Sequence, residues 1–108
     1  MEAEKAIHAF TAILEQLDQY SRLLADQASS NPENDLPVSE FILTIDLLKH
    51  ACMRGIFGYN PARYAKKDLA TNLDRIVARY QQIWLLRNRP GGLKDSLSYF
   101  EITKSDYQ

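Results

Sequence analysis

The residues best suited to bind a metal ion or to act as a nucleophile are two histidines and one cysteine. His50 and Cys52 are two positions apart, so their side chains would point in different directions on a helix. His8 lies far from both, and no histidine pair has the spacing of a helical zinc site. Cys52 lies in an apolar helical run, and no neighbourhood that would activate its thiol is evident from the sequence. We therefore expect ordinary polar or core residues here, with no metal site and no cofactor.

A second candidate for chemistry is Pro90–Ser96, where two glycines, a lysine and a serine lie near an expected helix start. Backbone amides at a helix N-terminus can hold phosphate. A phosphate-binding loop, however, follows a strand and ends in a lysine directly followed by Ser or Thr. Lys94 and Ser96 are not adjacent, and no strand pattern precedes them. The spacing therefore favours a helix stop over a nucleotide site.

Basic and aromatic residues alternate between positions 63 and 89, a combination that can bind single-stranded nucleic acid. Arg75 and Arg79 are four positions apart, which places them on one face of a helix. The other members are Arg63, Tyr64, Lys66, Lys67, Tyr80, Trp84, Arg87 and Arg89. The sequence pI is about 6.1, whereas nucleic-acid-binding domains are usually strongly basic. A nucleic-acid partner is therefore not expected.

The acidic residues offer no obvious pair for acid–base catalysis, because most fall on the expected polar faces of helices. Asp46 is the exception, since it adjoins an apolar stripe within reach of a basic residue on the following helix. Its simplest role is an ion pair at the edge of the core. Without a cleft there is no case for an active site, and we assign no catalytic residue.

Length and composition are those of one globular domain. The chain has 108 residues, of which 45% are hydrophobic and 25% are charged. The formal net charge is −1, but residues 1–35 carry a net charge of −5 and residues 61–108 one of +4. The simplest account is an acidic helix packed beside a basic one, and the alternative is a basic face that meets an acidic partner.

Targeting signals are not apparent. No apolar run is long enough to cross a membrane, so no membrane partner is expected. The N-terminus lacks the basic and apolar segments of a signal peptide, and a single cysteine fits a reducing compartment. These features favour the cytoplasm, but a fragment of a larger protein would look the same, so the location stays open.

Apolar residues recur every three or four positions, the pattern of amphipathic helices. Four helices are expected, over about residues 2–28, 37–57, 61–87 and 93–102. Asn60–Pro61 is suited to begin the third helix, and a break near Lys66–Lys67 is the alternative. The residues after 102 are expected to fray. The repeat of about 3.5 residues predicts an all-α fold: an elongated up-down-up three-helix bundle with a short C-terminal capping helix.

The second of these helices is the most apolar, so we expect it at the centre of the core. Its stripe consists of Phe41, Ile45, Leu48, Cys52 and Ile56. The first helix has a stripe of Ile7, Phe10, Leu14, Leu17, Ser21 and Leu24, widened by Ile13, Tyr20 and Leu23.

The most unusual segment is residues 80–96, YQQIWLLRNRPGGLKDS. Pro90, Gly91 and Gly92 stop a helix whose last turns carry the chain's one tryptophan. The residues that we expect to act in docking are Tyr80, Trp84, Arg87, Asn88 and Arg89. Trp and Arg are common anchors of interfaces. The alternative is structural, in which Arg87, Asn88 and Arg89 cap carbonyls or pair with acidic residues of the same domain.

This segment resembles the C-terminal end of bacterial glycoside hydrolase family 20 β-N-acetylhexosaminidases that carry a helical third domain. The matching positions are Trp84, Arg87, Asn88, Arg89, Pro90, Gly91, Gly92, Leu93 and Ser96. The specific part is residues 80–96, and the rest agrees only as a helical pattern of suitable length. The resemblance implies a catalytic Asp–Glu pair on an upstream β/α barrel, which this chain does not contain.

The resemblance thus implies a non-catalytic accessory domain that packs on the catalytic barrel of the same chain or on a second subunit. Its expected roles are to stabilise the barrel and to support a homodimer, and the chain itself would have no activity. The alternative is a free-standing helical interaction or regulatory domain that dimerises through its helix faces. The substrate sugar cannot be inferred from these residues.

Overall fold

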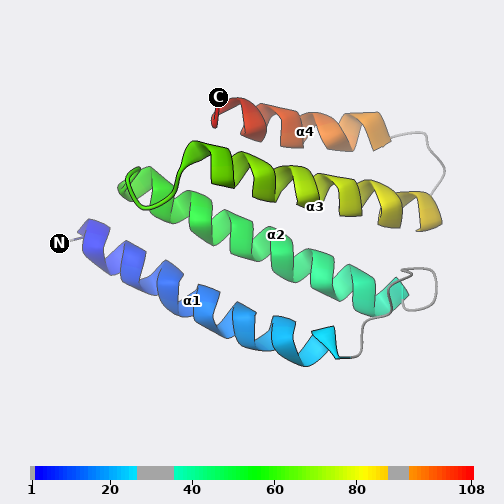
Figure 1. Ribbon diagram of the computed structural model, residues 1–108, viewed down its shortest axis with the longest axis horizontal. Helices are drawn as coiled ribbons and strands as arrows, with labels where there is room; N and C mark the ends of the chain where they lie inside the picture. Colours follow the sequence, from blue (N-terminus) through cyan, green and yellow to red (C-terminus); the bar gives the residue numbers. More distant parts are fainter. Residues whose placement is uncertain (1, 27–35, 88–92) are drawn as a thin grey trace.

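The computed structural model describes residues 2–26, 36–87 and 93–108, apart from the side chains of Arg87, Lys94 and Asp95. In that part of the chain it has four helices: α1 (Glu2–Ala25), α2 (Leu36–Tyr59), α3 (Lys66–Arg87) and α4 (Leu93–Ser105). Each helix runs antiparallel to the one before it, and they lie side by side in chain order (Figure 1). The predicted all-α bundle with a short C-terminal helix is confirmed.

The third helix begins later than its favoured prediction, at Lys66 instead of Pro61. Residues 60–65 form a turn, in which the Asn60 carbonyl accepts from the Arg63 amide at 3.1 Å. The Asn60 side chain also accepts from the Ala62 amide at 3.3 Å. Asn60 therefore caps a turn and not a helix, because Asn readily bonds backbone two residues on. The alternative break near Lys66–Lys67 was the correct one.

The C-terminal tail is ordered by packing, so the prediction that it frays was wrong. Helix α4 continues to Ser105, and the amides of Asp106 and Tyr107 bond to the carbonyls of the preceding turn. The Tyr107 side chain is only 4% exposed. An aromatic ring of this size provides enough buried apolar area to hold a chain end in place.

The core is divided among successive helix pairs. Helix α1 packs on α2, α2 also packs on α3, and α3 packs on α4. One cluster, built on Leu17, Ile45 and Cys52, joins α1 to α2. A second, built on Leu43, Ile76 and Ile83, joins α2 to α3. A third, built on Leu69, Leu73 and Tyr107, lies where α4 meets the α2–α3 pair.

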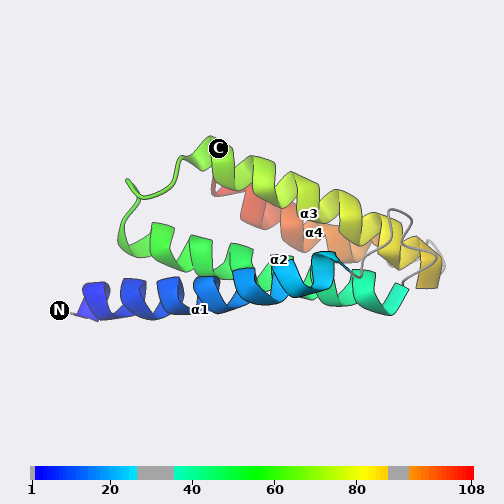
Figure 2. The ribbon, with the colours of Figure 1, turned by 60° about the horizontal axis from the view of Figure 1, so that its bottom comes forward.

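The overall shape follows from this serial packing. The molecule measures 46 × 31 × 19 Å, and its radius of gyration of 15.1 Å exceeds the roughly 13 Å of a compact chain of 100 residues. Turning the view shows α3 and α4 above α1 and α2 (Figure 2). The predicted elongation is confirmed.

The predicted central position of α2 is confirmed, because α2 packs on α1 along one side and on α3 along another. Leu43 is 7% exposed on the α3 side, and Ile45 is 6% exposed on the α1 side. The predicted stripe members Phe41 and Leu48 are 66% and 50% exposed. On α1 the flanking residues Ile13, Tyr20 and Leu23 are likewise exposed. Periodicity located the helices but not the number of sides that each helix buries.

A glycine sets the approach of α1 to α2. A Cβ atom at Gly55 would lie 2.7 Å from Cζ of Phe10, whereas one at Gly58 would meet nothing within 4 Å. The Phe10 ring therefore lies directly on the α2 backbone at Gly55. Lys49 and Asp18, 2.6 Å apart, form an ion pair between the same two helices.

The two glycines predict opposite results for the same substitution. Gly58→Ala should raise the free energy of unfolding by about 0.5 kcal/mol, because alanine favours the helical state and nothing obstructs its methyl group. Gly55→Ala should lose this gain, because Phe10 must move. Urea denaturation of the two variants measures the difference. An equal gain at both positions would show that Phe10 does not constrain the α1–α2 contact.

Candidate protein-docking site

An aromatic pair lies near the C-terminal end of α3. Tyr80 and Trp84 are four residues apart, so one helix face brings their rings together. The ring centroids are 5.9 Å apart, with an interplanar angle of 29°. Phe100 of α4 meets the Tyr80 ring edge-on, with the two ring centroids 5.2 Å apart. The aromatic pair is therefore held from α4 while Trp84 remains partly exposed.

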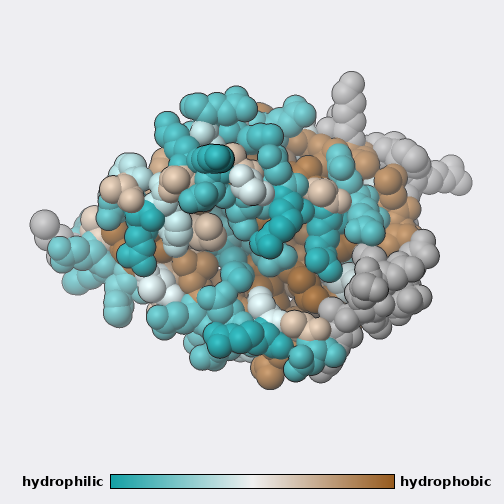
Figure 3. Space-filling model, in the orientation of Figure 1, coloured by the Kyte–Doolittle hydropathy of each residue, from teal (hydrophilic) through white to brown (hydrophobic). Residues whose placement is uncertain are grey.

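Beside this pair runs a groove of about 240 Å³ between α2 and α3. Its lining is mainly apolar and consists of Glu40, Leu43, Thr44, Leu47, Tyr80, Ile83 and Trp84. Hydrophobic side chains also reach the surface over the C-terminal end of α3, toward the right of Figure 3. A groove with an aromatic wall and a polar rim has the composition of a protein-binding surface.

The structure brings two of the five predicted docking residues to this groove. Tyr80 and Trp84 form its wall. Arg87 is the last residue of α3, but its side chain and all of Asn88 and Arg89 lie outside the described residues. Sequence reasoning did not find the α2 side of the groove, because Leu43 and Leu47 are not members of the stripe predicted for that helix. The sequence did contain one indication of this surface: the two leucines are four residues apart, near the apolar start of α2.

The acidic residue singled out in the sequence, Asp46, lies in a separate surface hollow. It shares that hollow with Arg75 and Arg79 of α3, so the predicted proximity to basic residues is confirmed. Within the described residues no salt bridge joins Asp46 to either arginine. The Nε atom of Arg79 is buried without a hydrogen-bond partner. The predicted ion pair at the core edge is therefore not formed.

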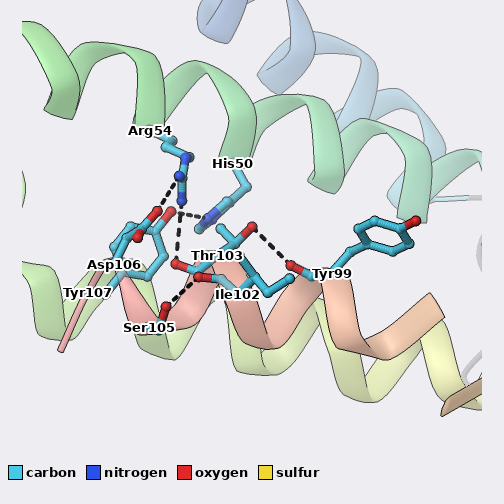
Figure 4. A network of polar contacts seen from close by, with 8 residues as sticks. All are labelled: His50, Arg54, Tyr99, Ile102, Thr103, Ser105, Asp106 and Tyr107. Carbon is cyan, nitrogen blue, oxygen red and sulfur yellow. Dashed lines mark hydrogen bonds and ion pairs between the residues drawn. The ribbon is translucent and has the colours of Figure 1, made fainter. Parts of the chain in front are cut away.

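A polar network that the sequence did not reveal joins three helices at His50, which is 5% exposed. Its Nδ1 lies 2.7 Å from the amide oxygen of Asn72 on α3. Its Nε2 lies 2.7 Å from the Tyr107 hydroxyl (Figure 4). An amide oxygen can only accept, so Nδ1–H donates to Asn72. The neutral ring then accepts at Nε2 from the Tyr107 O–H.

Charges near this network come from α2 and α4. The Arg54 guanidinium donates to Asp106 and to the Thr103 carbonyl, and it lies over the Tyr107 ring, 5.7 Å from its centroid. The hydrogen bond with Tyr107 contributes most to raising the pKa of Arg54, and the hydrogen bond with Asp106 contributes less. Arg54 therefore stays charged. Burial lowers the pKa of His50 below 6.5, Asn72 opposes this, and the Arg54 charge adds to the lowering.

The remaining reactive residues form no site in the described part of the chain. Cys52 is a buried free thiol, and burial raises its pKa, so it is protonated and weakly reactive. No group of three His, Cys, Asp or Glu residues among those described could hold a metal ion. No helix in the same part of the chain has the length and apolar character to cross a membrane.

No family model, curated protein sequence or solved structure matches this chain.

Proposed function

We propose that this chain is a non-catalytic helical domain that packs on the catalytic barrel of a β-N-acetylhexosaminidase-like glycoside hydrolase. The observation that carries the proposal is a coincidence of two features. Trp84 belongs to residues 80–96, the segment that resembles these enzymes, and it also forms one wall of the apolar groove. A segment that attaches one domain to another needs such a partly exposed aromatic anchor.

The groove suits a contact with an apolar segment of the barrel. Leu43, Leu47 and Ile83 form its floor and sides, Trp84 and Tyr80 form a rigid wall, and Glu40 lies at the polar edge. The pair is fixed by Phe100 from behind, so little side-chain entropy is lost when a partner binds. The role of this domain would be to stabilise the barrel.

Binding to a barrel tests the proposal directly. A family 20 barrel that has been truncated before its own helical domain is titrated with this chain, and calorimetry gives Kd. Trp84→Ala should raise Kd by about 30-fold, because loss of an interface hot spot costs about 2 kcal/mol. Tyr59→Ala is the matched control, since Tyr59 is 54% exposed at the other end of α2.

A second variant separates docking from stability. Thr44 is exposed and lines the groove from α2, so Thr44→Lys would place a charge in the groove without removing a core side chain. It should weaken binding as strongly as Trp84→Ala and leave the melting temperature within about 2 °C of wild type, since exposed substitutions change stability little. Absence of binding by the wild-type chain would refute the role on a barrel.

The alternative is a free-standing interaction domain that dimerises through helix faces. A specific observation favours it: apolar side chains are exposed on adjacent helices, namely Ile13, Tyr20 and Leu23 on α1 and Phe41 and Leu48 on α2. Exposed apolar faces of this kind mark interaction surfaces. Sedimentation equilibrium distinguishes the two, because a dimer mass that persists without a barrel supports this alternative.

A further inference from the structure

The attachment of α4 depends on groups at its C-terminal end. Tyr107 inserts its ring between α2 and α3, where it contacts the buried Leu69 and Leu73 and lies edge-on to Phe57. Its hydroxyl bonds to His50, and the adjacent Asp106 pairs with Arg54. In addition to these contacts, α4 is held on α3 by Phe100 and by the ion pair between Lys104 and Asp74.

The burial of His50 favours its neutral form. With Nδ1–H donating to Asn72, the Nε2 lone pair accepts the Tyr107 O–H. Protonation at Nε2 would reverse this bond, because the Tyr107 oxygen would then accept from Nε2–H. The added positive charge would lie in a buried site, where a charge without a paired anion is costly. The new positive charge would also face Arg54 of the same helix.

Among the described residues, the groups that interact with His50 include no unpaired anion. From α3, the side chain that faces His50 is the uncharged Asn72. From α4, the groups are Tyr107 and, next to it, Asp106, whose carboxylate is already bound to Arg54. A buried cation without a paired anion is costly, so the protonated ring favours a form in which water reaches it.

We propose that His50, Asn72 and Tyr107 form an acid-sensitive latch, which releases α4 from α2 and α3 when the His50 imidazole is protonated. The sign follows from linkage. Burial holds the pKa of His50 below 6.5 in the closed form, so the open form binds the proton more readily. The closed form is fully favoured above pH 6.5 and loses this advantage as the pH falls below it.

Release of α4 is the local outcome because α1 and half of α2 do not depend on it. The α1–α2 cluster of Leu17, Ile45 and Cys52 shares no residue with the cluster that contains Tyr107. Opening would uncover Leu69 and Leu73, which are otherwise 0% and 2% exposed. The acid-opened form would therefore present a new apolar surface on α3. This inference stands independently of the docking groove.

Hydrogen exchange of the full chain between pH 7 and pH 5, corrected for the intrinsic pH dependence, tests the latch. If the open form titrates at its ordinary pKa, the open population in wild type should rise by at most about 25-fold in α4. The rise in α1 should be much smaller. His50→Gln cannot be protonated and should abolish the rise. His8→Gln should leave it unchanged, because His8 is the exposed histidine on α1.

Two results would overturn the proposal. A wild-type α4 whose protection does not change between pH 7 and pH 5 would show that His50 is not a latch. Equal loss of protection in all four helices would show that His50 supports the whole fold. Labelling of the buried Cys52 thiol reports opening of α1 from α2, so it provides an independent check. If His50→Gln does not fold, Arg54→Gln should reduce the rise, because it removes the positive charge that faces the protonated ring.

Discussion

Replacing Ile76 by alanine should lower the free energy of unfolding by about 3 kcal/mol. Ile76 is 2% exposed and lies with Leu43 and Ile83 in the cluster between α2 and α3. Removal of its side chain loses the transfer free energy of three carbons and leaves a cavity. This cluster joins α2 to α3, so the contacts between α1 and α2 and between α3 and α4 cannot replace it. Urea denaturation followed by circular dichroism measures the loss.

Ile102→Ala provides the control for that experiment. Ile102 is 66% exposed on α4, so the same chemical change should alter the free energy of unfolding by less than about 0.5 kcal/mol. Alanine is also the better helix former, which offsets part of any lost contact. Similar losses at positions 76 and 102 would contradict the division of the core described above.

Tyr107→Ala should lower the free energy that holds α4 in place by about 3 kcal/mol. The mutation removes a ring that is 4% exposed and packs against Phe57, a loss in the range of buried aromatic residues. It also leaves Nε2 of His50 without its hydrogen-bond partner. Hydrogen exchange should show that α4 loses its protection first. The pKa of His50 should move toward its ordinary value, because solvent then reaches the ring.

The control in this helix is Tyr99→Ala. Tyr99 is 73% exposed, so its removal should leave both the exchange of α4 and the titration of His50 nearly unchanged. Proton NMR follows the two histidines separately. If Tyr99→Ala and Tyr107→Ala weaken α4 equally, Tyr107 is not its anchor.

Helix positions could be predicted from the sequence because they depend on local periodicity. The stripe of α1 from Phe10 to Leu24 predicted that helix correctly, and Leu17 is its most buried member. The arrangement of the helices depends on contacts that periodicity does not encode. Phe41 and Leu48 belong to a regular helical stripe, yet both are exposed. The reason is that α1 and α3 cover other faces of α2.

The site was predictable only in part, for the same reason. Trp84 and Tyr80 were visible as unusual residues before a helix stop, whereas the groove also needs residues from α2. His50 meets residues 22 and 57 positions away in the chain, so no local pattern could identify its partners. One signal was present: Leu93, Leu97 and Phe100 continue at helical spacing through position 104 to Tyr107.

The antiparallel order of the helices places α1's first turn at one end of the molecule, while the C-terminal end of α3, the helix that carries Trp84, lies toward the other end (Figure 1). A domain joined ahead of α1 would therefore be attached at the end away from the groove. A body that reaches the groove from there must extend along most of the 46 Å length. Within one chain, such a tether gives an effective concentration on the order of millimolar. A contact at the groove that is too weak to form between separate molecules would then still form when both domains belong to one chain.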